Sequence, residues 1–357
     1  MINVTKTFLP PQEEYNNILK KAWDAGWITN RGALVKELEE KLKKHLKVSN
    51  ILATTNGTLP LQIALKALGL KGEIITTPFS YVATTSSIVW EGCTPVFVDI
   101  HPEYLTIDET KIEAAINSKT TAILATHVFG NPCAVDEIEV IAKKHNLKVI
   151  YDAAHCFGVT YKGKSIFEYG QVSTCSFHAT KLFHTGEGGA LFTNDKDLQN
   201  KLFYHHNFGH TGPYTLVSLG INAKMSELQA AMGLAVFPYM EQIENSRQSV
   251  CGFYDDNLNF NKLVGIKIRS ETQWNYSYYP IIFESERVLE TVVAALNEQD
   301  VYPRRYFYPS LENLPYIQSN NCSIGDSTAR RVLCLPLFHD LSVNSLKKIV
   351  DIINKNV

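Results

Sequence analysis

Hydrophobic positions between about residues 50 and 200 fall into two alternating patterns. Short runs rich in β-branched residues alternate with stretches whose apolar residues recur at spacings of three and four. The runs predict strands and the spacings predict amphipathic helices. We expect strands at 73–78, 94–99, 120–127, 147–153, 172–177 and 189–194, and helices at 107–117 and 134–145. Such alternation is typical of the α/β class, with a mostly parallel sheet sandwiched by helices.

The pattern changes beyond about residue 250. A longer helix is predicted near Met225, and after it come separate strands and helices, such as 276–283 and 345–353. With 357 residues, the chain exceeds the length at which single cores stop growing, roughly 250 to 300 residues. We therefore predict a large α/β domain over 1–250 and a smaller C-terminal α+β domain over 251–357.

Composition narrows the class of protein. The chain is 45% hydrophobic and 20% charged, with a net charge of -2 and seven cysteines. This balance is typical of a globular protein and gives no drive toward nucleic acid or a membrane surface. The cysteines form no CxxC pair and no histidine and carboxylate cluster predicts a metal site. The first residues do not resemble a signal peptide and no apolar run could span a bilayer, so we expect a cytoplasmic protein.

One lysine stands in an apolar setting. In CSFHATKLFHTGEGGA (175–190), Lys181 is flanked by Phe177, Leu182 and Phe183, which should be buried. Two interpretations remain open from this segment alone. The amine reaches water while its stem covers apolar surface, or it is a desolvated nucleophile that forms a Schiff base with a carbonyl.

Polar and aromatic residues follow two of the predicted strands. In KVIYDAAHCFG, Asp152 ends an apolar strand, and a buried carboxylate needs a cation or hydrogen-bond donors. A protonated ring nitrogen of a bound molecule could be that cation, and His155 could hydrogen-bond a polar substituent beside it. The alternatives are that Asp152 is a helix N-cap and that His155 is an interior histidine whose hydrogen bonds are satisfied. In TTPFSYVATTSS, Tyr81 could stack on a flat cofactor at the strand end, whereas Phe79 is expected in the core.

The segment NGTLPLQIALKAL predicts a loop that leads into a helix. Thr58 suits the N-cap and Pro60 suits the first turn. The backbone N–H groups of Gly57 and Thr58 could therefore hold a phosphate at the helix start, although simple capping explains the pattern too.

A second phosphate-binding motif appears in an unsuitable context. GVTYKGKS, Gly158 to Ser165, matches the P-loop pattern, which would predict a nucleotide hydrolase. A P-loop requires a strand directly before it and a long helix after it, whereas only IFEYG separates Ser165 from the next predicted strand. YKGK is better interpreted as a turn. The glycine-rich HTGEGG (184–189) is explained by tight backbone packing beside Lys181.

The order of the remaining signals fits one cofactor. A phosphate-type helix start, an aromatic at a strand end, a strand-terminal aspartate and a lysine match the phosphate, flat ring, ring nitrogen and aldehyde of pyridoxal phosphate. Lys181 would hold this cofactor as an imine, be displaced by an incoming amine, and then move a proton as the free amine.

Six motifs carry a resemblance to a known family: NGT (56–58), TTPFSYVAT (76–84), YDAAH (151–155), SFHATK (176–181), GEGG (186–189) and GINAKMSELQAAMGL (220–234). These motifs, taken in this order, resemble those of the DegT/StrS-type sugar aminotransferases, which are fold-type I pyridoxal-phosphate enzymes. The resemblance covers nearly the whole chain. The resemblance implies that Lys181 is the Schiff-base lysine, Asp152 the partner of the pyridinium nitrogen, Tyr81 the stacking ring and His155 the contact to the phenolic oxygen. A branch of this family replaces the lysine by histidine, so the intact Lys181 favours transamination, with pyridoxamine phosphate formed in the half-reaction.

The resemblance also implies how the phosphate is bound. Gly57, Thr58 and Ser176 would hold it, and Asn222 is expected to reach the phosphate of the neighbouring subunit. The chain should therefore form a homodimer with shared active sites. Lys224 stands where the family usually has arginine, which keeps the charge but loses the planar fork.

The substrate is implied most specifically by TKTFLPPQEEY at the start, WITNRG (27–32) and YPRRYFYPSLENLPY (302–316). These segments are similar to those of transaminases that make dTDP-4-amino-4,6-dideoxyglucose for O-antigen synthesis, with a dTDP-4-keto-6-deoxy sugar as acceptor and L-glutamate as amino donor. Trp27, Asn30, Arg304 and Tyr306 are the candidate substrate residues, because basic and aromatic groups suit a pyrophosphate and a thymine ring. The galacto epimer, a 3-amino sugar and a cofactor-binding protein without turnover remain alternatives.

Overall fold

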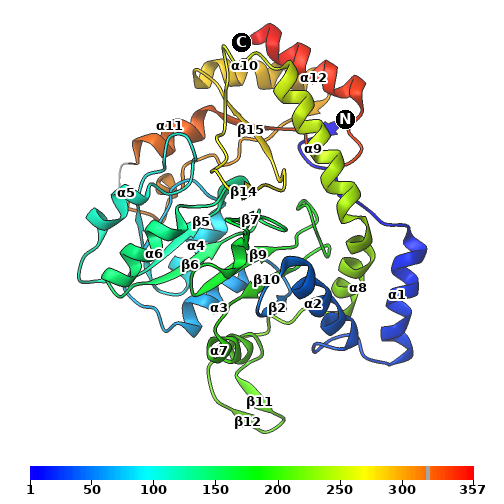
Figure 1. The fold of residues 1–357 in the computed structure, drawn as a ribbon, viewed down its shortest axis with the longest axis vertical. Helices are drawn as coiled ribbons and strands as arrows, with labels where there is room; N and C mark the ends of the chain where they lie inside the picture. The colour runs from blue at the N-terminus through cyan, green and yellow to red at the C-terminus, as the bar shows by residue number, and fades with distance from the viewer. Residues whose placement is uncertain (319–321) are drawn as a thin grey trace.

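A seven-stranded sheet forms the centre of the molecule (Figure 1). The structure is a computed structural model that describes residues 1–318 and 322–357. The strand order is β2-β10-β9-β6-β5-β3-β4, with bounds β2 Ile51–Thr54, β3 Glu73–Thr76, β4 Thr94–Phe97, β5 Thr120–Thr126, β6 Lys148–Asp152, β9 Val172–Ser176 and β10 Gly189–Phe192. Strands β4, β3, β5, β6 and β9 are parallel, and β10 runs antiparallel to both of its neighbours. The six strands expected from the sequence are confirmed, and β2 was not predicted.

Both faces of this sheet are covered by helices. Successive strand residues point to opposite faces, and the buried residues accordingly divide into two apolar clusters. Ile75, Ile123 and Val149 pack with residues of α2 and α8, whereas Ile74 and Ile150 pack with residues of α3 and α7. The helices are α1 Gln12–Asp24, α2 Ala33–Leu46, α3 Leu59–Ala67, α4 Val82–Trp90, α6 Val135–Lys144, α7 Lys196–His206 and α8 Glu227–Val236. The predicted α/β sandwich is therefore observed.

Two of the predicted helices differ in detail. The helix expected at 107–117 is a single turn, α5 Glu109–Ile112, followed by the 3-10 turn Glu113–Ala115. The helix expected near Met225 begins as α8 after a capping box at Ser226, which satisfies the first N–H groups. It continues through a 3-10 turn that contains Pro238 into α9 Met240–Asn257.

The C-terminal part builds a second apolar core. Its sheet has the antiparallel order β13-β15-β17, with bounds Val264–Gly265, Tyr279–Ile282 and Val332–Leu335. It packs with α9, α10 Glu286–Asn297 and α12 Val343–Asn356. The domain boundary at 250 stays a prediction: α9 runs across it, and β1 Ile2–Asn3 pairs with β16 Val301–Tyr302.

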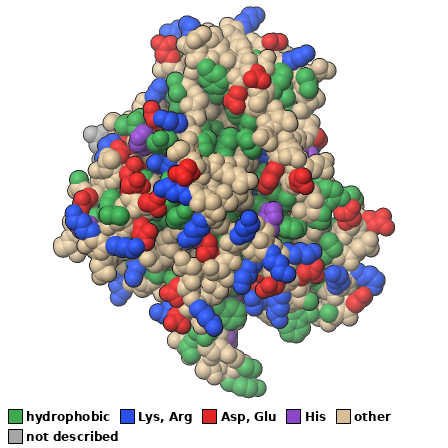
Figure 2. All heavy atoms as spheres, viewed as in Figure 1, with side chains coloured by type: hydrophobic (Ala, Val, Ile, Leu, Met, Phe, Trp, Pro, Cys, Tyr) green, Lys and Arg blue, Asp and Glu red, His purple; other side chains and the backbone are tan. Residues whose placement is uncertain are grey.

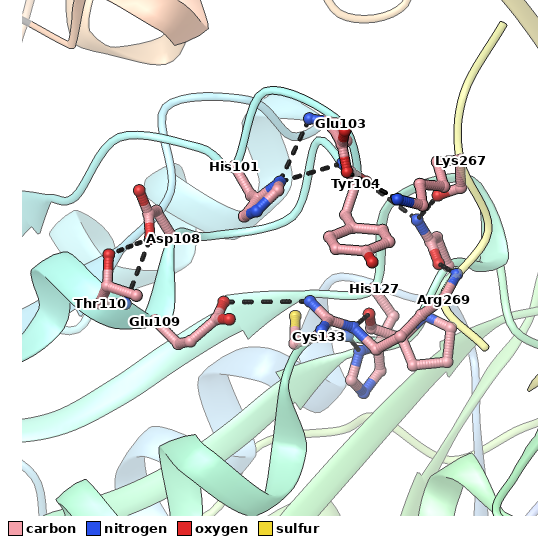
Figure 3. Close-up of polar contacts among 12 residues, drawn as sticks. His101, Glu103, Tyr104, Asp108, Glu109, Thr110, His127, Cys133, Lys267 and Arg269 are labelled. Atoms are coloured by element: carbon pink, nitrogen blue, oxygen red, sulfur yellow. Dashed lines mark hydrogen bonds and ion pairs between the residues drawn. The ribbon is translucent and has the colours of Figure 1, made fainter. Parts of the chain in front are cut away.

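The segment between β13 and β14 (Thr272–Gln273) is fastened to the large sheet by polar contacts (Figure 3). The guanidinium of Arg269 lies 4.3 Å from the centroid of the Tyr104 ring, and its Nε donates to the Pro132 carbonyl at 3.1 Å. Below it, buried His127 stacks on Tyr151 at 4.4 Å. Tyr151 precedes Asp152 in β6, so the stacking of His127 supports the strand that carries the candidate aspartate.

The remaining elements are short. They are β7 Thr160–Tyr161, β8 Lys164–Ser165, the projecting hairpin of β11 His210–Gly212 and β12 Thr215–Leu216, and α11 Ser323–Arg331. The segment GVTYKGKS forms the β7–β8 hairpin, whose turn residues Lys162 and Gly163 both have positive φ. The P-loop interpretation is therefore wrong, because a hairpin stands where a strand, phosphate loop and helix would be required. Among the helices that the structure describes, none is long and apolar enough to cross a membrane.

Candidate active site

The candidate residues lie where neighbouring strands end. Asp152 is the last residue of β6 and Ser176 the last residue of β9, and these two strands are adjacent and parallel. His155 follows β6, Tyr81 follows β3, and Lys181 follows β9. Carboxyl ends of parallel strands share one edge of the sheet, which is where open α/β folds bind ligands. One small cavity at this edge is lined by His155, Ser176 and Lys181.

Asp152 is a buried carboxylate with two donors. The Thr84 hydroxyl donates to Oδ2 at 2.7 Å, and the Ala154 N–H donates to Oδ1 at 3.2 Å. Burial raises the pKa of Asp152, and the Thr84, Ala154 and Lys181 groups oppose that rise. A cation beside this carboxylate would stabilise its charged form. The site therefore suits a protonated ring nitrogen, as the sequence predicted.

His155 has its tautomer set by the backbone. Nδ1 accepts a hydrogen bond from the Phe129 N–H at 3.0 Å, so the hydrogen of the neutral ring is on Nε2. Burial, with Lys181 nearby, holds the pKa of His155 well below its usual range. Its ring is stacked 5.7 Å from Phe307 and lies 4.7 Å from Tyr278. His155 can thus donate from Nε2 to an oxygen.

Lys181 lies in the loop between β9 and β10. Phe177, Leu182 and Phe183 are buried, as expected. The Lys181 amine donates to the hydroxyl of Tyr278 at 3.2 Å, rather than extending only into solvent. The loop is closed by a hydrogen bond from the Ala179 N–H to the Gly186 carbonyl at 2.7 Å, with φ of 80° at Gly186.

The start of α3 lies directly against the end of β9. A Cβ atom at Gly57 would lie 2.7 Å from the Ser176 Cβ, so only glycine permits this approach. Thr58 is the N-cap residue, but its side chain makes no capping bond; Asn56 Oδ1 instead accepts from the N–H groups of Thr58 and Leu59, each at 2.9 Å. The predicted N-cap position of Thr58 is therefore confirmed, and the Asx turn of Asn56 supplies the acceptor that satisfies these donors.

Tyr81 and Phe79 separate as the sequence suggested. Phe79 is fully buried in the core, whereas Tyr81 is 59% exposed at the N-cap of α4. The Tyr81 ring centroid lies 6.5 Å from that of Phe307, which in turn stacks on His155. Tyr81 therefore stands on the same side as His155, with a ring free to cover a ligand.

Asn222 follows the β11–β12 hairpin and forms an isolated bridge with Asn207, the residue after α7. It is exposed, and its Oδ1 accepts from the Lys224 amine at 2.7 Å. Lys224 pairs with Thr54 in β2, the terminal strand of the sheet. Burial lowers the pKa of Lys224. Asn222 thus lies at the β2 edge of the large sheet, in the segment that follows the projecting β11–β12 hairpin.

The four candidate substrate residues divide into two pairs. Trp27 and Asn30 line a separate groove between α1 and α2, next to Glu227. Tyr306 lies on the Lys181 side, with its ring 5.4 Å from that of Tyr278. Arg304 pairs with Cys334 of β17 in an isolated bridge. The structure therefore brings only Arg304 and Tyr306 toward the Lys181 region within one chain.

Two residues of the site were missed by sequence reasoning. Thr84 belongs to a chain of hydroxyls in which Thr126 donates to Ser80 at 3.0 Å and Ser80 bonds Thr84 at 2.7 Å. The density of hydroxyls in TTPFSYVATTSS was a signal that could have found it. Tyr278 had no local signal, because its contact with Lys181 spans 97 positions.

Comparison with known proteins agrees with this geometry. Residues 11–354 match the DegT/DnrJ/EryC1/StrS aminotransferase family. The chain is 42% identical to a dTDP-4-amino-4,6-dideoxy-D-glucose transaminase from Shigella dysenteriae, over 99% of this chain and 98% of the relative. It is 38% identical to an Escherichia coli protein of the same name, with the same coverage. A crystal structure of DesI in the presence of its TDP-sugar product superposes with a TM-score of 0.94 at 30% identity, covering 99% of this chain and 92% of that one. The chain therefore belongs to the DegT/DnrJ/EryC1/StrS aminotransferase family, as a sugar aminotransferase of fold type I that depends on pyridoxal phosphate.

Proposed function

We propose that the protein transfers an amino group from L-glutamate to the 4-keto carbon of dTDP-4-keto-6-deoxyglucose, giving dTDP-4-amino-4,6-dideoxyglucose. Two relatives that cover almost the whole chain carry the name of this transaminase. The product would serve O-antigen synthesis in the cytoplasm. Relatives named GDP-perosamine synthase (Escherichia coli O157:H7) and UDP-2-acetamido-2-deoxy-3-oxo-D-glucuronate aminotransferase (Pseudomonas aeruginosa) are 31% and 34% identical. Because the names of these relatives contain GDP- and UDP-linked sugars, the identity of the nucleotide is the part of the proposal that most requires a direct test.

The observation that carries the proposal is the convergence of Asp152, His155 and Lys181 at one edge of the sheet. The Asp152 carboxylate, the Nε2–H of His155 and the Lys181 amine would suit the ring nitrogen, phenolic oxygen and aldehyde of pyridoxal phosphate, in that order. Gly57 supplies the close approach beside Ser176 that a phosphate cradle requires. The residues present therefore fit the cofactor.

Each of these side chains has a definable task. When bound, pyridoxal phosphate supplies a ring that accepts the electron pair of a substrate C–H bond. Asp152 would pair with the protonated ring nitrogen, and Thr84 holds the Asp152 carboxylate in place. Lys181 Nζ would hold the cofactor through its aldehyde and, as the free amine, would carry a proton from and to substrate carbon. His155 donates from Nε2, and Tyr81 covers the site from the exposed side.

The proposed homodimer rests on an apolar surface. Figure 2 shows hydrophobic side chains on the projecting part of the molecule that Figure 1 assigns to β11 and β12. The exposed apolar residues of segment 208–221 are Phe208, Tyr214, Leu216, Val217, Leu219 and Ile221. A contiguous exposed apolar segment of this kind is typical of a protein interface. We infer that it docks on a second copy, where Asn222 at its base contacts the phosphate in the partner's site.

The sugar site would then combine residues of both subunits. Arg304 and Tyr306 lie on the Lys181 side of their own chain, whereas Trp27 and Asn30 line the groove between α1 and α2. We propose that the second pair serves the partner's site. Arg304 would pair with a phosphate of the nucleotide, and the rings of Tyr306 and Trp27 would pack on sugar or base.

Product analysis tests the proposed function. The purified protein is incubated with pyridoxal phosphate, L-glutamate and dTDP-4-keto-6-deoxyglucose, and the sugar product is identified by NMR from its ring couplings. An equatorial amine at carbon 4 supports the proposal. An axial amine identifies the galacto epimer, and an amine at carbon 3 identifies the other regioisomer. Parallel reactions with GDP- and UDP-linked keto sugars measure nucleotide preference. Turnover of the GDP sugar alone would contradict the dTDP assignment.

A further inference from the structure

Tyr278 approaches Lys181 from the C-terminal part of the chain. Its hydroxyl accepts the hydrogen bond of the Lys181 amine at 3.2 Å, and Nζ lies 5.5 Å from the centre of the same ring. Tyr278 directly precedes β15, whereas Lys181 belongs to the β9–β10 loop. The two parts of the molecule thus meet at the amine that the proposed function uses.

The Tyr278 ring is held rigidly. It is buried, with its centroid 4.7 Å from His155, 5.4 Å from Tyr306 and 6.0 Å from Phe129. These rings leave the hydroxyl as the polar end of the side chain, directed toward Lys181. A tyrosine loses little conformational freedom on forming such a bond, whereas a free lysine side chain has many rotamers.

The backbone that carries Tyr278 is fixed by buried side chains. Arg247 of α9 donates from Nε to the Tyr276 carbonyl at 2.9 Å and from Nη2 to the Ser277 carbonyl at 2.5 Å. The Asn275 amide donates to the carbonyls of His155 and Phe157, at 2.9 and 2.8 Å. The segment before Tyr278 is thereby fastened to the same loop that carries His155. The position of the hydroxyl relative to the site is set by the fold rather than by an exposed, mobile loop.

From these contacts we propose that Tyr278 is a positioning residue for Lys181. Its hydroxyl holds the amine at the place from which Lys181 bonds the cofactor aldehyde and, when free, exchanges a proton with substrate. The inference rests on the proposed function of Lys181 and deepens it, because it assigns a group that acts through the lysine. No bond is formed or broken at Tyr278 itself.

The test compares Tyr278→Phe with a matched variant, Tyr279→Phe. Both substitutions remove the phenolic oxygen of a buried tyrosine, but the Tyr279 ring belongs to the C-terminal core and its hydroxyl donates to the exposed Asp255 of α9 rather than binding Lys181. Apoenzyme of each variant is mixed with excess pyridoxal phosphate, and the growth of the visible band of lysine-bound cofactor is followed by stopped flow. This readout needs no sugar substrate and no turnover.

We expect Tyr278→Phe to capture the cofactor roughly 10- to 100-fold more slowly than the wild type, which is the range for loss of a hydrogen bond to a charged group. kcat should fall by a similar factor, with the KM for the sugar changed less than threefold. Tyr279→Phe should instead lower the unfolding temperature and leave the capture rate unchanged. If Tyr278→Phe captures cofactor and turns over at the wild-type rate, the inference is wrong.

A second variant guards against a folding defect. Tyr278→His retains a ring with a hydrogen-bonding nitrogen, so its capture rate should lie between those of the wild type and Tyr278→Phe. A rate no faster than that of the phenylalanine variant, with wild-type circular dichroism, would contradict the hydrogen-bond role. Failure of the proposed function is distinguishable, because wild-type protein would then form no visible band, and both proposals would fall together.

Discussion

The hydroxyl of Thr84 donates a 2.7 Å hydrogen bond to Oδ2 of Asp152 and thereby joins the first turn of α4 to the end of β6. Both side chains are buried, so the bond is shielded from water. Burial raises the pKa of Asp152, and this donor acts against that rise. The Thr84 hydroxyl therefore favours the charged form of the Asp152 carboxylate.

Replacement of Thr84 by valine should shift the pH profile of kcat. Loss of the donor raises the pKa of Asp152 further, so the acidic limb should move to higher pH. The kcat at neutral pH should fall about 10-fold, as expected for one hydrogen bond to a charged group. Asp152→Asn removes the charge completely and therefore shows the largest effect expected. Its kcat should fall at least about 100-fold, with cofactor binding affected less. An acidic limb unchanged in Thr84→Val would show that Thr84 does not tune Asp152.

Gly57→Ala should weaken cofactor binding. The new Cβ would lie 2.7 Å from the Ser176 Cβ and 2.9 Å from its Oγ, so the helix start must move away from β9. We expect the dissociation constant of pyridoxal phosphate, measured by fluorescence titration of apoenzyme, to rise about 10-fold or more. Gly252→Ala in α9 is the matched control, because no atom of the described residues beyond its own helix backbone and chain neighbours lies within 4 Å of the added Cβ. Equal affinities for the two variants would argue against a phosphate cradle at Gly57.

Mixing two inactive variants should restore activity if the sites are shared. Lys181→Ala lacks the amine in its own subunit, whereas Asn222→Ala lacks the contact given to the partner. In a hybrid dimer both defects fall in one site and the other site is intact. After unfolding and refolding together, activity should return to about a quarter of the wild-type value for random pairing in a two-fold dimer. No recovery from a mixture shown by native mass spectrometry to contain hybrids would place Asn222 in its own subunit's site.

His206 should make stability depend on pH. Burial lowers the pKa of His206 to about 4, below the value near 6.5 of an unfolded chain. The unfolded state therefore binds one more proton between these values, and the free energy of unfolding should fall as pH drops from about 6.5 toward 4. His206→Gln should flatten this slope by up to about 1.4 kcal/mol per pH unit. Urea denaturation at several pH values between 7 and 5 measures the slope. Buried His127, with a pKa of about 3, acts in the same direction in both proteins. Identical slopes for the variant and the wild type would refute the assignment.

The large sheet was predictable because its central strands are short, apolar and buried on both faces. The end of the helix expected at 107–117 is instead set by local polar contacts. Asn117 Oδ1 accepts from the Lys119 N–H, and the Asn117 N–H donates to the Thr120 hydroxyl oxygen, which forms a turn just after the 3-10 segment. The helix expected through residue 117 therefore ends early. β2 was missed because a four-residue apolar run carries no periodicity.

The candidate cofactor residues could be named from the sequence where the chemistry is local. Lys181 and Asp152 stand out because a charge in an apolar segment requires an explanation. The contact of Tyr278 with Lys181 could not be predicted in this way, because it joins distant segments of the chain. For the same reason the sequence did not show that Trp27 and Asn30 lie in a different groove from Tyr306. Thr58 is the N-cap residue, as predicted, but the sequence did not show that the Asn56 side chain would accept the first N–H groups of α3 in its place. Both side chains suit that role, and the backbone conformation decides between them.

The most direct test of the account is to find the residue that bonds the cofactor. Protein loaded with pyridoxal phosphate is reduced with borohydride, digested and analysed by peptide mass spectrometry. We predict loss of the visible band and a pyridoxyl-phosphate mass on Lys181 alone, with no such label in a folded Lys181→Ala control. Label on another lysine, or its absence from Lys181 in protein that has bound the cofactor, would contradict the central claim.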